Sequence, residues 1–480
     1  MATRNPLLFS LVFIAAQYIP AYAHTHHDVS EEQLHAPLDA ILFLHIGLQA
    51  LVWGVLFPIG MVFGLSRSRW HVPLQSLAFA LTFGGIILGH AHGGRQFPHS
   101  FHGSFGSWIL LPIFTQLSLG IYLKLHIHER TLRPYAVRAH GILGRIWPIL
   151  GWVQGLFGVI VLMGLCGEEG AGQCAAHYIM GSAFIAYGII MAILLVAGEN
   201  WVRQSGRSPE WWDSWVIMLW GTVNTFTEHH GGKWSVKDMQ HTVLGVIWWA
   251  GGALGIYLAQ KCHPRSDVRH LGSLPADRSD NTILHDSITL TGWAMSEHAQ
   301  AFMLSTKVHA MFGYTLMLAG LTRIIDICFI STSSSTGPLD DNESEHTLTS
   351  GINAPGEPKP KAARAFRHLP PLLLMAAGVI FMSATDEELD AAQDVGVDHV
   401  TYILGMYSVA FVLYLFTLFL INLYATSGRN ADTPTHTNDV VFSASLNGEI
   451  ELTSPRDASK WYAPVPREEG TVHVLGEDEE

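Results

Sequence analysis

Histidine is the residue type in this sequence best suited to chemistry, because many of its 27 copies lie at the ends of apolar stretches. Four of them form a regular pattern in the first third of the chain. His45 lies near the start of one apolar stretch and His102 just before another, while His71 and His140 open the two stretches that alternate with these. Neutral imidazole nitrogens bind metal ions and serve as axial ligands of haem iron. The pattern therefore predicts two pairs of ligands.

The direction of successive helices decides how these histidines pair. In an up-and-down bundle, alternate helices run the same way. His45 and His102 are then expected near the luminal face of the membrane, and His71 and His140 near the cytosolic face. Each pair can approach one flat macrocycle from opposite sides. Two b-type haems, one in each leaflet, would carry electrons across a hydrocarbon core of about 30 Å, which is too thick for unaided transfer.

Glycine follows two of these histidines by one helical turn, as Gly106 after His102 and Gly144 after His140. A missing side chain on the histidine face makes room for a flat ring or for a neighbouring helix. The same spacing recurs later in the chain at His177/Gly181, His241/Gly245 and His309/Gly313. The spacing alone therefore does not identify a haem site.

Two further groups of histidines have the residue types of a metal site. His24 and His26 would follow a new amino terminus and could hold cupric ion, but a flexible histidine-rich tail also explains them. His229, His230 and His241 lie in or beside one short acidic luminal loop, where they either bind metal or cap helix ends. In both groups the structural explanation is the favoured one.

Membrane-spanning helices are the elements that must position these residues. Only 14% of the 480 residues are charged, against roughly 25% in average soluble proteins. Ten apolar stretches are long enough to cross a bilayer. They lie near residues 38–65, 72–91, 104–125, 141–165, 175–197, 211–228, 241–260, 306–330, 368–384 and 399–424. The predicted fold is an all-α, polytopic membrane protein with about ten transmembrane helices.

The amino terminus has the features of a signal peptide. Arg4 precedes a short apolar run over residues 7–16, and Ala21-Tyr22-Ala23 has the small-x-small form of a cleavage site. Cleavage after residue 23 would leave the mature amino terminus in the lumen or outside the cell. Basic residues gather in the first and third loops, as expected for cytosolic loops. We expect an integral membrane protein of the secretory pathway, in the endoplasmic reticulum, the vacuole or the plasma membrane.

Two of the four cysteines share the fourth loop, which this topology places in the oxidising lumen. Cys166 and Cys174 are eight residues apart in a glycine-rich segment, so a disulfide can close there. A cysteine-based metal site would need further ligands, and none is close in sequence. A disulfide between Cys166 and Cys174 is therefore predicted.

Two segments lack the apolar periodicity needed to build a core and are predicted to be disordered. One is a linker near residues 331–366 and the other is the acidic tail, residues 431–480. Asn342 could be glycosylated if the linker is outside, whereas the basic residues that follow it favour the cytosol. The segment 283–303 decides between the two sides, and its polar residues indicate an interfacial position. The net charge of −13 disfavours nucleic acid as a partner.

The amino-terminal motifs resemble a known family. They are His45, Trp53-Gly54, Pro58-Ile59-Gly60, His71-Val72-x-x-Gln75, His102-x-x-x-Gly106, Gln116, Arg133-Pro134 and His140-x-x-x-Gly144-Arg145. This set resembles the four-helix transmembrane core of cytochrome b561 proteins, particularly the form fused to DOMON domains. The resemblance implies one haem on His45 and His102 and another on His71 and His140, within a domain over residues 24–200. A DOMON domain and the ascorbate-binding segment of ascorbate-using members have no counterpart, so the electron donor is not predicted.

The carboxyl-terminal half, residues 201–430, resembles another family. Its motifs are Trp220-Gly221-Thr222-Val223-Asn224, Glu228-His229-His230-Gly231-Gly232, Asp238-x-Gln240-His241, Lys307-Val308-His309, Arg323, Ser383-Ala384-Thr385-Asp386-Glu387-Glu388 and Asp398-His399-Val400. They are similar to those of the fungal Ytp-type membrane proteins. That resemblance implies a membrane architecture but no particular reaction.

Two classes of function fit the sequence. The first is a transmembrane oxidoreductase, a cytochrome b561-type enzyme that moves single electrons from a cytosolic reductant to a luminal acceptor such as ferric or cupric ion. The second is a haem-free transporter or structural scaffold that uses its histidines for packing or metal passage. Both have the lipid bilayer as partner, and both are compatible with a homo-oligomer.

Overall fold

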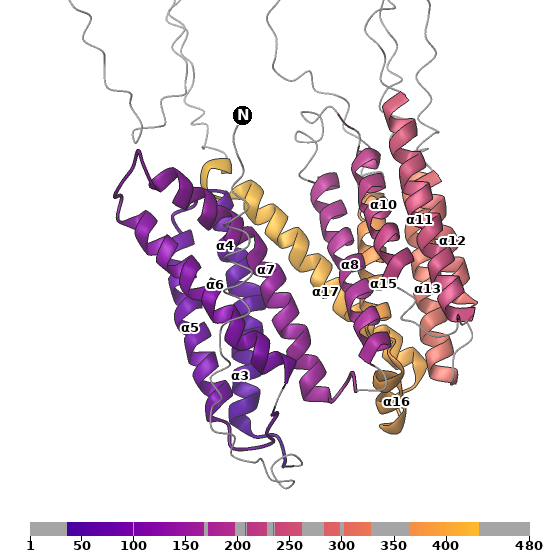
Figure 1. The fold of residues 1–480 in the computed structure, drawn as a ribbon, viewed down its shortest axis with the longest axis horizontal. Helices are drawn as coiled ribbons and strands as arrows, with labels where there is room; N and C mark the ends of the chain where they lie inside the picture. The colour runs from indigo at the N-terminus through magenta and orange to yellow at the C-terminus, as the bar shows by residue number, and fades with distance from the viewer. Residues whose placement is uncertain are drawn as a thin grey trace, which may run out of the picture. The chain divides into compact units, whose positions relative to one another are not determined.

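The structure is a computed structural model that describes most of the membrane region. The described residues are 36–98, 100–167, 171–196, 207, 209–227, 234, 236–261, 283–297, 302–327 and 365–431. All regular elements among them are helices (Figure 1). The predicted signal peptide and several predicted sites lie outside the described residues, namely His24, His26, His229, His230, Asn342, nearly all of the linker and the tail from residue 432.

The amino-terminal bundle carries all four predicted haem ligands. Its elements are α3 (Ala40–Leu51), the π-helix η1 (Val52–Leu56), α4 (Phe57–Leu65), α5 (His71–Ala91), α6 (Phe101–Lys124) and α7 (Arg133–Met163). The first three form one span of 26 residues. Pro58 cannot donate a backbone hydrogen bond, and the turn before it widens into the π-helix. Asp39 caps the start of this span by accepting a hydrogen bond from Leu42 N at 2.9 Å.

The helices of this bundle pack around an aromatic core. α5 lies against α3 and α4, α6 lies against α7, and α7 also contacts η1 and α4. Trp147 is 4% exposed and stacks on Trp53 with ring centroids 5.3 Å apart. Gly151 makes this stack possible, because a Cβ there would lie 2.6 Å from the Trp53 ring. The core thus holds α7 against the first span at mid-height.

The carboxyl-terminal helices form a second packed group. They are α8 (Ala171–Val196), α10 (Pro209–Thr227), α11 (Val236–Lys261), α12 (Ile283–Ser296), α13 (Met303–Ile325), α15 (Leu369–Met382), α16 (Asp386–Asp394) and α17 (His399–Thr426). α10 to α13 contact one another in sequence order, and α15 packs against α8, α13 and α17 (Figure 1). Glycines allow the backbones to touch, since a Cβ at Gly252 would lie 2.7 Å from Ser214 O.

The number of candidate spans among the described residues is close to the expected count of about ten. Eight helices among the described residues are long and apolar enough to cross a membrane, or nine if the pair α15 and α16, bent by 77°, is one span. The stretch near 211–228 forms α10, which is not among them. The segment 283–303, expected at the interface, contains α12, whose 14 residues reach about 21 Å. α12 packs along α13, where Gly292 and Gly313 bring the two backbones together.

A buried ion network joins the carboxyl-terminal helices. Arg323 of α13 lies 2.6 Å from Asp326 and 3.9 Å from Asp213 of α10, measured between side-chain nitrogen and oxygen atoms. Arg367, just before α15, approaches Asp326 at 3.8 Å. These two cations and two anions balance in charge. The network therefore has a structural role: it pairs the buried charges, which would be costly unpaired inside a membrane bundle, and it connects α10, α13 and the start of α15.

The last helix reaches back to the first loop between spans. α17 contacts α8, α13 and α15, and it also contacts α4 of the amino-terminal bundle. Ser427 Oγ lies 2.8 Å from Ser66 Oγ, and Arg429 N donates to Ser66 O at 2.8 Å. Gly428 lies against the backbone of Ser66 with a φ of +59°, where a side chain has no room. The end of α17 is thus fixed to the loop that leads into His71.

Candidate functional site

The structure brings the four predicted ligands together in the predicted pairs. The ring centroids of His45 and His102 are 6.1 Å apart, with ring planes at 87°. Those of His71 and His140 are 6.2 Å apart, with planes at 84°. A metal–imidazole bond of about 2 Å means that two imidazoles on opposite faces of one iron have centroids about 6 Å apart. Both pairs therefore have the separation of a bis-histidine site.

Backbone carbonyls orient three of the four rings. The Nδ1 atoms of His45, His71 and His102 lie 2.7, 2.8 and 3.1 Å from the carbonyl oxygens of Gly85, Gly60 and Gln154. A ring that donates from Nδ1 keeps its lone pair on Nε2, the arrangement found in metal-binding histidines. The Nδ1 atom of His140 is buried and has no hydrogen-bond partner within the described ranges.

Glycines on neighbouring helices make room for the rings. A Cβ at Gly89 would lie 2.7 Å from the His45 ring, one at Gly64 would lie 2.9 Å from the His71 ring, and one at Gly158 would lie 3.2 Å from the His102 ring. Gly60 and Gly85, which supply the carbonyls, lie one turn before Gly64 and Gly89 on the same helices. Each of the first two rings thus rests on a glycine pair of the adjacent helix.

The glycines singled out in the sequence have a different contact. Gly106 faces Gln154 and Gly144 faces Gln116. A Cβ at Gly106 would lie 3.0 Å from the amide nitrogen of Gln154, and one at Gly144 would lie 3.1 Å from that of Gln116. These side chains reach across to the ligand helices. Gln154 Nε2 donates to His102 O at 3.0 Å, and Gln116 Nε2 donates to His140 O at 3.2 Å. Gly106 and Gly144 therefore admit a glutamine that fixes the helix of a histidine.

Gln75 and Gln116 appear among the amino-terminal motifs, but no role was predicted for any glutamine. Gln49 and Gln75 follow His45 and His71 by one turn, and Gln116 and Gln154 follow His102 and His140 by about four turns. The amide oxygens of Gln49, Gln116 and Gln154 are buried, and no described residue donates a hydrogen bond to them. This repeated offset between histidine and glutamine was a signal available in the sequence.

An aromatic group lies at mid-height between the two histidine pairs. On α7, Trp147 lies two turns after His140 and two turns before Gln154, whose carbonyl orients His102. Phe57 and Phe79 pack on Trp147 with centroid distances of 5.6 and 5.8 Å. The space between the two pairs is therefore filled by rings.

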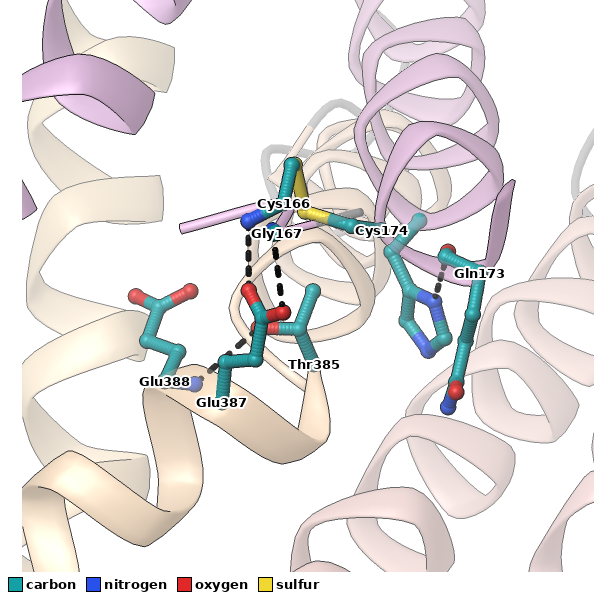
Figure 2. Close-up of a disulfide and its surroundings, with 8 residues drawn as sticks. Cys166, Gly167, Gln173, Cys174, Thr385, Glu387 and Glu388 are labelled. Carbon is teal, nitrogen blue, oxygen red and sulfur yellow. Dashed lines mark hydrogen bonds between the residues drawn. A yellow bond between two sulfur atoms is a disulfide. The ribbon is translucent and has the colours of Figure 1, made fainter. Parts of the chain in front are cut away.

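The predicted disulfide is present in the structure, where Cys166 and Cys174 are bonded (Figure 2). Glu387 of α16 accepts hydrogen bonds from the backbone nitrogens of Cys166 and Gly167 (Figure 2). The disulfide loop is thus held to the helix that follows α15. This contact, between segments more than two hundred residues apart, has no signal in the local sequence.

The predicted luminal cluster is only partly described. His241 lies in α11, where its carbonyl accepts a hydrogen bond from Asn224 Nδ2 of α10 at 3.0 Å. Within the described ranges, no three or more His, Cys, Asp or Glu side chains are grouped closely enough to hold a metal ion. Metal binding by His24, His26, His229, His230 and His241 stays a prediction.

Comparison with known proteins decides the family. Residues 150–425 match the family described as Protein YTP1-like, C-terminal. The chain belongs to the YTP1-like family. Residues 25–126, which include the first three of the four paired histidines, match a domain of unknown function, DUF2427. No cytochrome b561 family is matched, so that resemblance stays a prediction.

One of the relatives of this YTP1-like chain is named as a membrane protein. It is 40% identical over 280 residues to Protein YTP1 of Saccharomyces cerevisiae, an alignment that covers 58% of this chain and 52% of that protein. It is 24% identical over 442 residues to the uncharacterized membrane protein C3B8.06 of Schizosaccharomyces pombe, covering 67% and 86%. The chain thus spans about half the length of the first of these relatives. No solved structure matches.

Proposed function

We propose that this YTP1-like protein carries single electrons across its membrane through two bis-histidine b-type haems, from a cytosolic reductant to a luminal acceptor such as ferric or cupric ion. The observation that supports this proposal is the repeated histidine geometry. Two pairs of imidazoles, on four different helices, have centroid separations of 6.1 and 6.2 Å. Edge-to-face packing of two rings could produce one such pair. Two such pairs, in which three of the four rings are oriented by carbonyls and lie against glycines, favour ligation.

The residues around the pairs suit a flat cofactor. Gly64, Gly89 and Gly158 leave space at the rings where any larger residue would collide. The buried amide oxygens of Gln116 and Gln154, without donors among the described residues, point to polar partners supplied from elsewhere. When bound, haem iron supplies a carrier that takes up and releases one electron.

The protein's own contribution is orientation and the exclusion of water. His45 and His102 would hold one haem, and His71 and His140 the other. The carbonyl contacts keep the Nδ1 hydrogen of His45, His71 and His102 in place and so raise the basicity of these three ligand nitrogens. Trp147 and its aromatic neighbours keep the space between the pairs free of water. Thus α3, α5, α6 and α7 act as a rigid frame.

Absorption spectroscopy of the purified full-length protein tests the proposal directly. We expect two b-type haems per chain in a pyridine haemochrome assay and a reduced-minus-oxidised difference spectrum. His45→Gln or His102→Gln should lose about half of the haem, and the double variant should lose no more, because a single imidazole holds haem poorly. His71→Gln and His140→Gln should remove the other half.

Exposed histidines provide the matched control. His126 and His128 lie in the loop between α6 and α7, so His126→Gln and His128→Gln should keep both haems. Proteoliposomes loaded with a chemical reductant such as dithionite should reduce external ferricyanide only when both pairs are intact. Protein that folds but contains no haem would refute the proposal and leave the transporter or scaffold alternative.

A further inference from the structure

Three arginines lie in the two segments that join where the end of α17 reaches the loop between α4 and α5. Arg67 and Arg69 belong to that loop, and Arg429 belongs to the short 3-10 helix η5 (Gly428–Asn430) that follows α17. Arg429 N donates to Ser66 O at 2.8 Å, so the two segments are bonded directly beside Arg67. All three arginines are exposed. We call this group the arginine junction.

The backbone at Arg67 has a conformation that usually carries glycine. At the end of α4, Arg67 N donates to Gly64 O at 3.1 Å. Ser68 N donates to Phe63 O at 2.8 Å, which completes the hydrogen-bond pattern of a Schellman motif. Arg67 is the left-handed residue of this motif, with a φ of +57°. The chain thus places a cation where the backbone favours glycine, and such local conflicts are typical of functional sites.

The positive charges of the junction are not balanced by carboxylates of the described chain. None of the three arginines forms an ion pair with a described residue. Glu129, in the loop between α6 and α7, lies 3.5 Å from His126 instead. Like charges held close together repel, so the junction favours an anion that neutralises them. Guanidinium groups suit phosphate in particular, because they present paired donors to its oxygens.

Apolar side chains beside the junction indicate that it lies at the level of the lipid headgroups. Trp70 is 55% exposed and Leu65 is 37% exposed, one at each end of the loop. The guanidinium of Arg69 lies over the Trp70 ring, 5.7 Å from its centroid. Tryptophan is enriched at the boundary between membrane and water. A soluble anion would contact only the arginines, whereas a phospholipid also contacts the apolar side chains.

We propose that Arg67, Arg69 and Arg429 bind the phosphate of an anionic phospholipid, with Trp70 and Leu65 against its acyl chains. The predicted topology puts this loop on the cytosolic side, where anionic lipids attract basic residues. The site is complete only when α17 has reached the loop, since Arg429 comes from its far end. It uses none of the proposed haem ligands, so its test does not depend on electron transfer.

Lipid binding to the purified full-length protein tests the proposal. Native mass spectrometry of the protein in detergent, titrated with phosphatidylserine or phosphatidylcholine, counts the bound lipids and gives their affinities. A basic residue near an anionic surface contributes about fivefold to binding, so three contribute about a hundredfold. The triple variant Arg67→Gln, Arg69→Gln, Arg429→Gln should therefore bind its tightest phosphatidylserine about a hundredfold more weakly than wild type. Its binding of phosphatidylcholine should be unchanged.

A matched triple variant removes the same charge elsewhere on the same face. Lys124→Gln, Arg130→Gln and Arg138→Gln change three exposed cations in and beside the loop between α6 and α7, and this protein should keep the tight phosphatidylserine. Equal weakening in both triple variants would show that only net charge matters and would overturn the site. An excess of inorganic phosphate should not displace the lipid, and displacement would identify a soluble anion as the ligand instead.

A single substitution separates lipid binding from folding. Arg67→Asn removes the charge but supplies a residue type that tolerates the left-handed conformation. It should unfold at the same temperature as wild type or at a higher one, and it should bind phosphatidylserine about fivefold more weakly. Wild-type affinity for phosphatidylserine in Arg67→Asn and in the triple variant of the junction would refute the proposal.

Discussion

Alanine substitutions at two glycines test the haem-site geometry with little risk to the fold. A Cβ at Gly89 would lie 2.7 Å from the His45 ring, and one at Gly64 would lie 2.9 Å from the His71 ring. Ordinary Cβ contacts begin near 3.4 Å. The His45 ring must therefore move by about 0.7 Å in Gly89→Ala, while metal–ligand distances tolerate only about 0.2 Å. We expect Gly89→Ala to lose the luminal haem and Gly64→Ala the cytosolic one.

The same helices offer controls for this experiment. Gly47 lies in α3, and a Cβ there would have no described atom of a neighbouring residue within 4 Å. A Cβ at Gly120 would lie 3.6 Å from His140, an ordinary van der Waals contact. Gly47→Ala and Gly120→Ala should keep both haems, and Gly47→Ala should stabilise its helix by up to about 1 kcal/mol. Haem content per chain and thermal unfolding in detergent are the two measurements. Retention of both haems in Gly89→Ala and Gly64→Ala would show that the rings do not ligate iron at these positions.

Three further outcomes are expected. Cys166→Ser should lower the unfolding free energy by about 2–3 kcal/mol, and reductant should destabilise wild type but not the variant in thermal unfolding. Arg323→Met should cost about 3–5 kcal/mol because it leaves Asp326 buried without its closest cation, and Arg323→Met with Asp326→Leu should recover part of that loss. The acidic helix α16 is not by itself among the candidate spans. Burial raises the pKa of its Glu388 to about 7, so folding stability should fall as pH rises from about 4.5 to 7. Glu388→Gln should abolish that fall and be more stable than wild type at pH 8 by about 1–3 kcal/mol, and an unchanged pH profile would contradict the assigned burial.

Hydrophobic pattern and helix direction predicted the all-helical membrane fold and the pairing of the four histidines. Each of the four histidines lies in the first part of its helix. Because successive helices alternate in direction, the starts of every second helix lie on the same side of the membrane. Eight or nine candidate spans lie among the described residues, against the expected count of about ten, and an apolar stretch gives no information on bends such as the one between α15 and α16. α10, a 19-residue helix, is long enough to span but is not among the helices whose composition is apolar enough.

The details of the sites could not be predicted because they depend on contacts between distant segments. The sequence links His102 to Gly106 on its own helix, whereas the ring lies beside Gly158 of α7. His177 and His309 had the same glycine spacing as His102, yet only the packing of α8, α13 and α15 shows that their rings meet. Local periodicity defines the faces of a helix but not the identity of its partner.

The contact between Ser66 and Ser427 has a consequence for biogenesis. The two residues are 361 positions apart. A ribosome that adds about 5–20 residues per second needs roughly 20–70 s to make that segment. During this interval the loop before His71 lacks the residues that later cover it. Chains interrupted before α17 would expose the hydroxyl and carbonyl of Ser66, which complete chains bury.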